Sequence, residues 1–191
     1  MIYWQMPTIA NGTILETDGE VRIRATKGVQ NLSLNCPFSF EMPNASPNSN
    51  MTIYNGTDNG TFVDWANTGN SFTFTNYGYL GYTSSFGWLN ADINAGSSFS
   101  NTITFASQTD NLTNVGIFIY IPATKTVMQV YNLTSGAIPN GTAIKVILMA
   151  QDASGQLFSY TESRTASANT TMTVSLNSTT DADLTTYLDA L

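Results

Sequence analysis

The sequence predicts an all-β protein, an antiparallel β-sandwich of the jelly-roll or Ig-like kind. Short segments alternate apolar and polar residues with a period of two, and two further segments are apolar on both faces. Turn-forming residues separate these segments at intervals of about ten residues, with no helical repeat between them, which is typical of sandwiches and jelly rolls. Apolar residues make up 42% of the chain, enough to form a sizeable core.

Four segments have the period-two pattern of strands with one buried and one exposed face. They are EVRIRAT (20–26), SFTFTN (71–76), NTITFAS (101–107) and TTMTVSLN (170–177). The buried faces are expected to carry Val21, Ile23 and Ala25; Phe72 and Phe74; Ile103 and Phe105; and Met172, Val174 and Leu176.

The central strands are predicted at NVGIFIYIP (114–122) and AIKVILMA (143–150), which are apolar on both faces. PATK (122–125) and QDASGQ (151–156) have the composition of hairpin turns. At the end of the chain, Leu184, Tyr187, Leu188 and Leu191 follow a helical spacing after a cap at Thr180 or Asp181. A short C-terminal helix and a last strand both fit these eleven residues.

The predicted organisation is an N-terminal arm over residues 1–12 and one β-sandwich head domain over residues 13–191. The arm begins MIYWQMP, in which Ile2, Trp4 and Met6 lie on one face of an extended strand. Such a strand either pairs within its own sheet or adds to the sheet of another subunit. PTIANG (7–12) is the expected hinge.

The composition excludes several classes of function. Charged residues make up 10% of the chain and the net charge is −7, which argues against a nucleic-acid partner. The chain contains no His and one Cys, so His-dependent triads, His-ligated zinc and an intrachain disulfide are excluded. Cys36 is expected to be a small buried apolar residue. No local pattern marks a pair of catalytic carboxylates, and no enzymatic activity is expected.

N-glycosylation sequons are twice as frequent as chance predicts. Eleven occur, whereas random placement of the 20 Asn and 46 Ser or Thr residues gives roughly five. Asn44 is the weakest, because Pro47 follows its Ser46. The ten predicted glycosylation sites are Asn11, Asn31, Asn50, Asn55, Asn59, Asn111, Asn132, Asn140, Asn169 and Asn177.

Turn chemistry is an alternative explanation for some of these sequons. Asn-Gly-Thr at Asn11, Asn55, Asn59 and Asn140 is good hairpin chemistry in its own right. It explains less easily the sequons without glycine, such as Asn50, Asn111, Asn132 and Asn169. We therefore expect glycans, and we expect Asn50, Asn55 and Asn59 on the outer surface.

No cofactor is expected. Asp58 and Asp64 lie in Asn-rich loops that suit calcium oxygens, but no complete calcium-loop motif is present and solvated turn carboxylates are the preferred interpretation. Lys145 is the one candidate for an isopeptide bond. The aromatic residues Tyr77, Tyr79, Tyr82, Phe86 and Trp88 would form a sugar-stacking platform if exposed, and we expect them to be mostly buried.

No run of 18 apolar residues is present, so no transmembrane segment is expected. The first residues lack the basic region and the long apolar region of a signal peptide. If the protein is secreted to the cell surface, the sequence is therefore its mature form.

Taken together, these features resemble the subunits of archaeal extracellular filaments of the thread and bundling-pilus kind. The resemblance lies in the apolar first strand MIYWQMP, the Ser/Thr/Asn-rich surface with many sequons, the lack of disulfides and the small number of basic residues. It implies a glycosylated β-sandwich that polymerises with copies of itself by donor-strand complementation, and it assigns assembly to Ile2, Tyr3, Trp4 and Met6. Surfaces or neighbouring filaments are further partners. The alternatives are a viral capsid or spike jelly roll and a secreted carbohydrate-binding or adhesion module.

Overall fold

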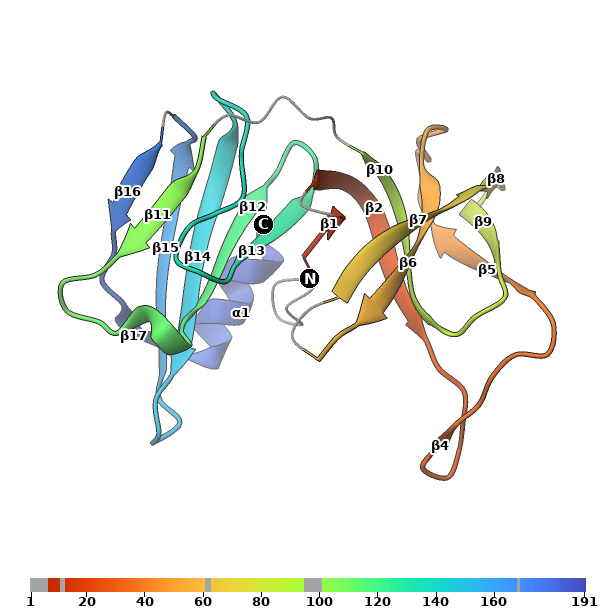
Figure 1. Ribbon diagram of the computed structural model, residues 1–191, viewed down its shortest axis with the longest axis horizontal. Helices are drawn as coiled ribbons and strands as arrows, with labels where there is room; N and C mark the ends of the chain where they lie inside the picture. Colours follow the sequence, from red (N-terminus) through yellow and green to blue (C-terminus); the bar gives the residue numbers. More distant parts are fainter. Residues whose placement is uncertain (1–6, 11–12, 61–62, 95–100, 168) are drawn as a thin grey trace. The chain divides into compact units, whose positions relative to one another are not determined.

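The computed structural model describes residues 7–10, 13–60, 63–94, 101–167 and 169–191 (Figure 1). The fold is all-β, built from antiparallel sheets and one parallel strand pair, with one short C-terminal helix. The predicted fold class is confirmed. The described part of the chain has no helix with the length and hydrophobicity that a membrane crossing requires.

The chain forms two compact units where the sequence predicts one head domain over residues 13–191. The first unit is Thr8–Ala95, and the second contains Gly96–Leu191. Each unit has its own cluster of buried apolar side chains, and this is the physical reason for the division. The boundary coincides with AGSSFS (95–100), a Gly/Ser-rich stretch of the kind that separates domains.

The first unit is a sandwich of a five-stranded sheet and a three-stranded sheet, with a small hairpin. The five-stranded sheet has the order β1-β2-β10-β6-β7, the three-stranded sheet is β5-β9-β8, and the hairpin is β3-β4. The strands are β1 (Ile9–Ala10), β2 (Thr13–Ile23), β3 (Thr26–Lys27), β4 (Gln30–Asn31), β5 (Phe38–Pro43), β6 (Thr52–Asp58), β7 (Val63–Ser71), β8 (Thr73–Phe74), β9 (Gly78–Thr83) and β10 (Gly87–Asn94).

The core of the first unit lies between its two sheets. Alternation along the strands brings Ile53 of β6 and Leu89 of β10 against Phe40 of β5 and Tyr79 of β9. Val21 and Ile23 of β2 pack against the same cluster, as the sequence predicts. Phe72 is buried in this core, whereas Phe74 is 45% exposed, so the prediction that both phenylalanines face inward is wrong for Phe74.

Part of the predicted arm belongs to the first unit's own sheet. Ile9 pairs with Ile14 and Ala10 with Thr13, which makes β1 a strand where the sequence predicts a hinge. The backbone N–H of Leu15 donates to the carbonyl of Thr8 at 2.9 Å, which extends this pairing. Cys36 is exposed, contrary to expectation, because it lies in the loop before β5 and outside the core.

The second unit is built on the five-stranded sheet β13-β12-β14-β15-β17, with the parallel pair β11-β16 and the helix α1. The predicted central strands over 114–122 and 143–150 correspond to β12 and β14, and β14 lies between β12 and β15. The elements are β11 (Ile103–Ala106), a 3-10 turn (Leu112–Asn114), β12 (Gly116–Ile121), β13 (Thr126–Val130), β14 (Ala143–Gln151), β15 (Leu157–Thr165), β16 (Thr170–Thr173), β17 (Asn177–Thr179) and α1 (Asp181–Asp189).

The C-terminal residues form a helix rather than a strand. Thr180 is the N-cap, and its Oγ1 accepts a hydrogen bond from the Asp183 N–H at 3.1 Å. Tyr187, Leu188 and Leu191 pack against Phe118 and Ile147, which face this side of the sheet. Alternation places Ile117 and Leu148 on the opposite face, where they are also buried.

Gly56 is required by packing within the first unit. A Cβ at this position would lie 2.4 Å from Val63 Cγ1, 2.8 Å from Trp88 Cβ and 2.9 Å from Trp65 Cζ3. We expect Gly56→Ala to lower the free energy of unfolding of the first unit by about 1–3 kcal/mol through overpacking. Urea unfolding followed by tryptophan fluorescence measures this, since Trp65 and Trp88 both lie in the first unit.

Gly136→Ala, in the second unit, is the comparison for a glycine with room for a Cβ, and its unfolding is followed by circular dichroism because Trp65 and Trp88 report on the first unit. A Cβ there would meet only Met128, at 3.4 Å from Cε, which is ordinary van der Waals contact. Its effect on stability should stay within about 0.5 kcal/mol. Unchanged unfolding of Gly56→Ala would show that the strands around Gly56 separate more easily than their packing indicates.

Candidate functional site

Most of the predicted glycosylation sites have exposed side chains. Asn11 lies outside the described residues, as do the predicted donor-strand residues Ile2, Tyr3, Trp4 and Met6. The exposed sites occur in both units and lie in loops, at a turn or in short strands at a sheet edge. They are Asn31, Asn50 and Asn59 in the first unit and Asn111, Asn132, Asn140, Asn169 and Asn177 in the second.

Several of these asparagines also have a structural role through Oδ1. Asn111 caps the 3-10 turn, where its Oδ1 accepts from the Thr113 N–H at 3.0 Å and the Thr113 hydroxyl at 2.6 Å. Asn169 Oδ1 accepts from the Thr102 N–H at 2.9 Å. The capping role therefore explains the Asn111 sequon equally well as glycosylation would. A glycan is joined through Nδ2, so these bonds and glycosylation are compatible.

Asn55 is different from the other predicted sites. It was expected on the outer surface, with hairpin-turn chemistry as the alternative explanation of its sequon, but it lies in a strand and is half-buried. Asn55 and Gly56 lie inside β6, which pairs with β10 on one side and β7 on the other. The Asn55 side chain is half-buried, and its Oδ1 is buried without a hydrogen-bond partner among the described residues. The turn that follows β6 instead uses Asn59-Gly60, with Gly60 at φ 87°.

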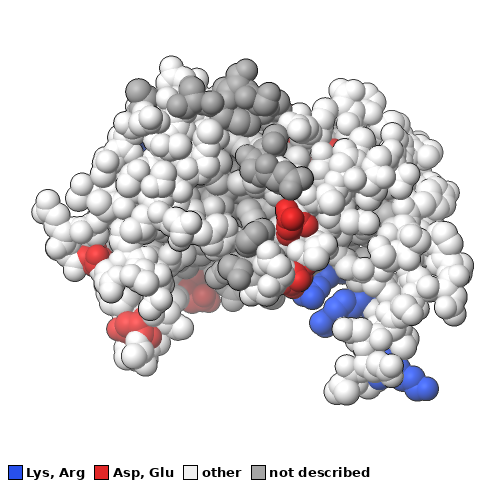
Figure 2. All heavy atoms as spheres, viewed as in Figure 1, with Lys and Arg blue, Asp and Glu red and all other residues white. Residues whose placement is uncertain are grey.

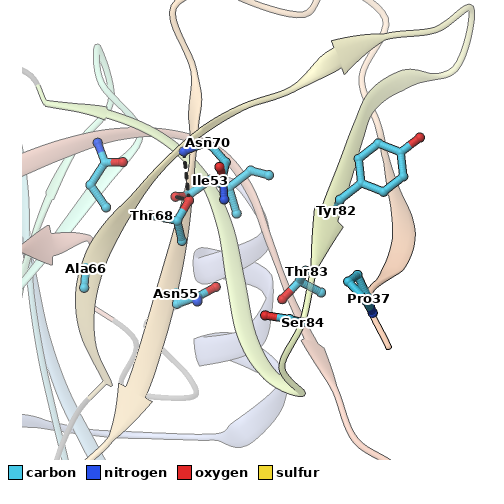
Figure 3. A pocket seen from close by; sticks show the side chains of 10 residues that line it. Pro37, Ile53, Asn55, Ala66, Thr68, Asn70, Tyr82, Thr83 and Ser84 are labelled. Atoms are coloured by element: carbon cyan, nitrogen blue, oxygen red, sulfur yellow. Dashed lines mark hydrogen bonds between the residues drawn. The ribbon is translucent and has the colours of Figure 1, made fainter. Parts of the chain in front are cut away.

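Asn55 lies in a groove of the first unit with a volume of about 500 Å³. In Figure 3 the hydroxyl groups of Thr83 and Ser84 point toward Asn55 from the far side of the groove, whereas the Tyr82 ring points away from it. The lining residues are uncharged; they are Pro37, Ile53, Asn55, Ala66, Asn67, Thr68, Asn70, Tyr82, Thr83 and Ser84.

A second polar group of residues lies on the face of the five-stranded sheet opposite the core. Asn90 and Asp92 of β10 are fully buried, and Glu20 of β2 pairs with Asn90. The Thr17 hydroxyl donates to Asn90 Oδ1 at 2.7 Å. Both carboxylate oxygens of Asp92, the Asn90 Nδ2 and the Glu20 Oε2 have no hydrogen-bond partner among the described residues.

Asp92 keeps its proton at neutral pH, and Glu20 is about half protonated there. Burial, together with the smaller effect of the Glu20 and Asp18 charges, raises the pKa of Asp92 from its ordinary 3.8 to about 8. Burial also raises the pKa of Glu20 to about 7. Sequence reasoning missed these residues, because Asn90 and Asp92 alternate with Leu89 and Ala91 and therefore have the pattern of an exposed strand face.

The predicted aromatic cluster is divided between core and surface. Tyr79 is fully buried and its hydroxyl donates to Asp18 Oδ2, while it accepts from the Asn48 N–H at 2.6 Å. Phe86 and Trp88 are half-buried. Tyr77 and Tyr82 are 74% and 59% exposed, so for these two residues the expectation of burial is wrong.

The weaker candidates from the sequence are a calcium site at Asp58 and Asp64 and an isopeptide bond at Lys145. Within the described ranges, no group of three or more acidic or Cys side chains is placed to hold a metal ion. Asp58 accepts from the Gly60 N–H at 3.0 Å and lies 3.8 Å from Arg22, while Asp64 is exposed on β7. Lys145 is half-buried in β14 between Tyr120 and Ser163.

Charge is sparse on the surface seen in Figure 2, where Lys and Arg gather at one end of the first unit, around the β3-β4 hairpin. Arg22 lines a groove together with Asn31 of this hairpin, and its guanidinium lies 4.9 Å from the Trp88 ring centroid. Comparison of the chain with protein-family models, curated proteins and solved structures finds no match. The interpretation of function therefore depends on the chain's own residues.

Proposed function

We propose that this chain is a structural subunit of an extracellular, N-glycosylated cell-surface filament, which polymerises head to tail by donor-strand complementation. The observation that carries the proposal is the excess of sequons together with the exposure of eight of their asparagines. Glycans on these side chains would supply surface hydration that the few charged residues do not. The apolar pattern of residues 1–7 supports assembly through an added strand.

Donation of a strand by each subunit to the next would produce a head-to-tail polymer. A strand at one end of a subunit and an acceptor edge elsewhere on the next form a heterologous contact, which produces a filament when it does not close into a ring. The donated backbone completes a ladder of hydrogen bonds, and Ile2, Trp4 and Met6 would each contribute about 1.5–3 kcal/mol by burial. This is the function that we assign to these residues and to Tyr3.

Glycosylation is tested by intact mass and glycopeptide mapping of protein from its native source. We expect a mass above the 20.6 kDa of the bare chain, with glycans on several of the eight exposed asparagines. We expect Asn55 to remain unmodified, because it lies within a strand hydrogen-bonded on both sides rather than in a surface loop.

The bare mass would contradict the glycosylation proposal. The matched comparison is Asn59, which shares the Asn-Gly-Thr sequence with Asn55 and is exposed. Equal occupancy at Asn55 and Asn59 would show that modification precedes the folding of the first unit. It would also show that structure does not select the sites.

A further inference from the structure

Between the two sheets of the first unit, the inward-facing side chains become polar beyond the apolar core. Along β6, the inward position after Ile53 is Asn55, and along β9 the inward position after Gly81 is Thr83. Thr83 pairs with Phe38 at the start of β5, so this polar end lies where β5 begins. Two inward-facing positions that would normally be apolar are therefore polar.

Asn55 is the unexplained member of this pair. The Thr83 hydroxyl donates to the Ser85 carbonyl at 3.1 Å, which satisfies its proton. The Asn55 Oδ1 is buried and has no partner among the described residues. A buried amide oxygen without a donor is unfavourable, and nearly all such groups in folded proteins have a partner. This oxygen is covered, so the Asn55 carboxamide must rotate toward the groove before a ligand O–H or N–H group can supply the missing donor.

The lining of the groove defines the chemistry of that ligand. None of the ten lining residues is charged, so an ionic ligand would lose its hydration without a counter-charge. Hydroxyl groups of Thr83 and Ser84 face Asn55 across the groove, as Figure 3 shows. A carboxamide offers a donor and an acceptor side by side, which matches two neighbouring hydroxyl groups of a sugar ring. The apolar side chains of Ile53, Ala66 and Pro37 suit the C–H faces of such a ring.

We propose that this groove is a binding site for a neutral saccharide, with Asn55 as the central hydrogen-bonding residue and Thr83 and Ser84 on the opposite wall. The volume of about 500 Å³ lies in the range of small-molecule sites, roughly 300–1,000 Å³. The site is independent of filament assembly and requires only the first unit. Its ligand is either a glycan carried by another copy of this chain or a saccharide from outside.

The experiment uses the full chain, produced without glycosylation, and isotope-labelled for NMR titration. The probes are the methyl glycosides of glucose, galactose and mannose, N-acetylglucosamine, glucuronic acid as the charged comparison, and glycans released from the native protein. We expect saturable shifts at the amides of Asn55, Thr83 and Ser84 with at least one neutral probe. Asn55→Ala should weaken binding roughly tenfold or more, equivalent to about 1.4 kcal/mol.

Two further variants test whether binding takes place in the groove. Ser84→Ala changes an exposed side chain of the opposite wall, so it should weaken binding without affecting the fold. Tyr77→Ser removes a ring that is 74% exposed and does not line the groove, so it should leave binding unchanged. Stronger binding of the released glycans than of the simple glycosides identifies the chain's own glycan as the ligand, and the reverse identifies a foreign saccharide.

Three results would overturn the proposal. One is the absence of saturable shifts with every neutral probe. Another is loss of binding in Tyr77→Ser with retention in Asn55→Ala, which would place the sugar on the exposed rings. The third is equal or tighter binding of glucuronic acid. None of these results bears on filament assembly, which concerns other residues.

Discussion

Removal of residues 1–7 is expected to abolish fibre assembly while leaving the subunit folded. The deletion ends before Thr8, whose carbonyl accepts from the Leu15 N–H, so the β1-β2 pairing is retained. The removed segment contains Ile2, Trp4 and Met6, the apolar face of the proposed donor strand. Electron microscopy measures assembly, and circular dichroism with Trp65 and Trp88 fluorescence checks that the first unit is intact.

Point substitutions refine this test. Ile2→Ser combined with Trp4→Ser removes the apolar anchors without shortening the chain, and it should also prevent assembly. Gln5 lies on the opposite face of the proposed strand from Ile2 and Trp4. The variant Gln5→Ser is therefore the matched control, and it should assemble normally. Fully formed fibres from the deletion variant would refute donor-strand complementation by residues 1–7.

Asp92→Asn is expected to stabilise the first unit at neutral and alkaline pH. The pKa of Asp92 is raised by burial to about 8, so the folded state keeps a proton that the unfolded state releases above 3.8. Stability therefore falls by about 1.4 kcal/mol for each pH unit between these two values. It is independent of this group below 3.8, where both states are protonated. Because Asn cannot ionise, the substitution should add on the order of 4 kcal/mol at pH 7.

Urea unfolding from pH 4 to pH 9, followed by tryptophan fluorescence, measures this effect. The wild-type stability should decline as pH rises through the range, and Asp92→Asn should decline less steeply. A smaller slope should remain, because the pKa of Glu20 is also raised, to about 7. Asp64→Asn is the control, since Asp64 is exposed on β7, at the edge of the same sheet. Lower stability of Asp92→Asn at every pH would mean that Asp92 is ionised and paired in the folded state.

Periodicity was sufficient to predict the strands whose two faces differ strongly. Ile103 and Phe105 are buried as their alternation with threonine predicts, and the helical spacing of Tyr187, Leu188 and Leu191 corresponds to α1. The division into two units was not predicted, because alternation describes each strand by itself and gives no information about which strands share a core. The Gly/Ser content of residues 95–100 was the available signal.

The errors at the candidate site have one physical cause: local sequence does not specify tertiary neighbours. Asn55-Gly56 has the composition of a turn, yet Gly56 is needed because Val63, Trp65 and Trp88 leave no room for a Cβ. Asp92 has the pattern of an exposed residue, yet it is buried on the second face of its sheet. By contrast, Asn59-Gly60 lies in the connection after β6, where the positive φ of Gly60 suits glycine and no described residue comes within 4 Å of a Cβ placed there.

The central claim is that the chain is a glycosylated subunit joined to its neighbours by a donated strand. A helical reconstruction of assemblies from the native source tests it most directly. We predict single-stranded fibres in which residues 1–7 of each subunit complete a sheet of the next, with glycan density on exposed asparagines such as Asn59 and Asn132. Closed shells, monomers, or fibres in which residues 1–7 stay within their own subunit would contradict the claim.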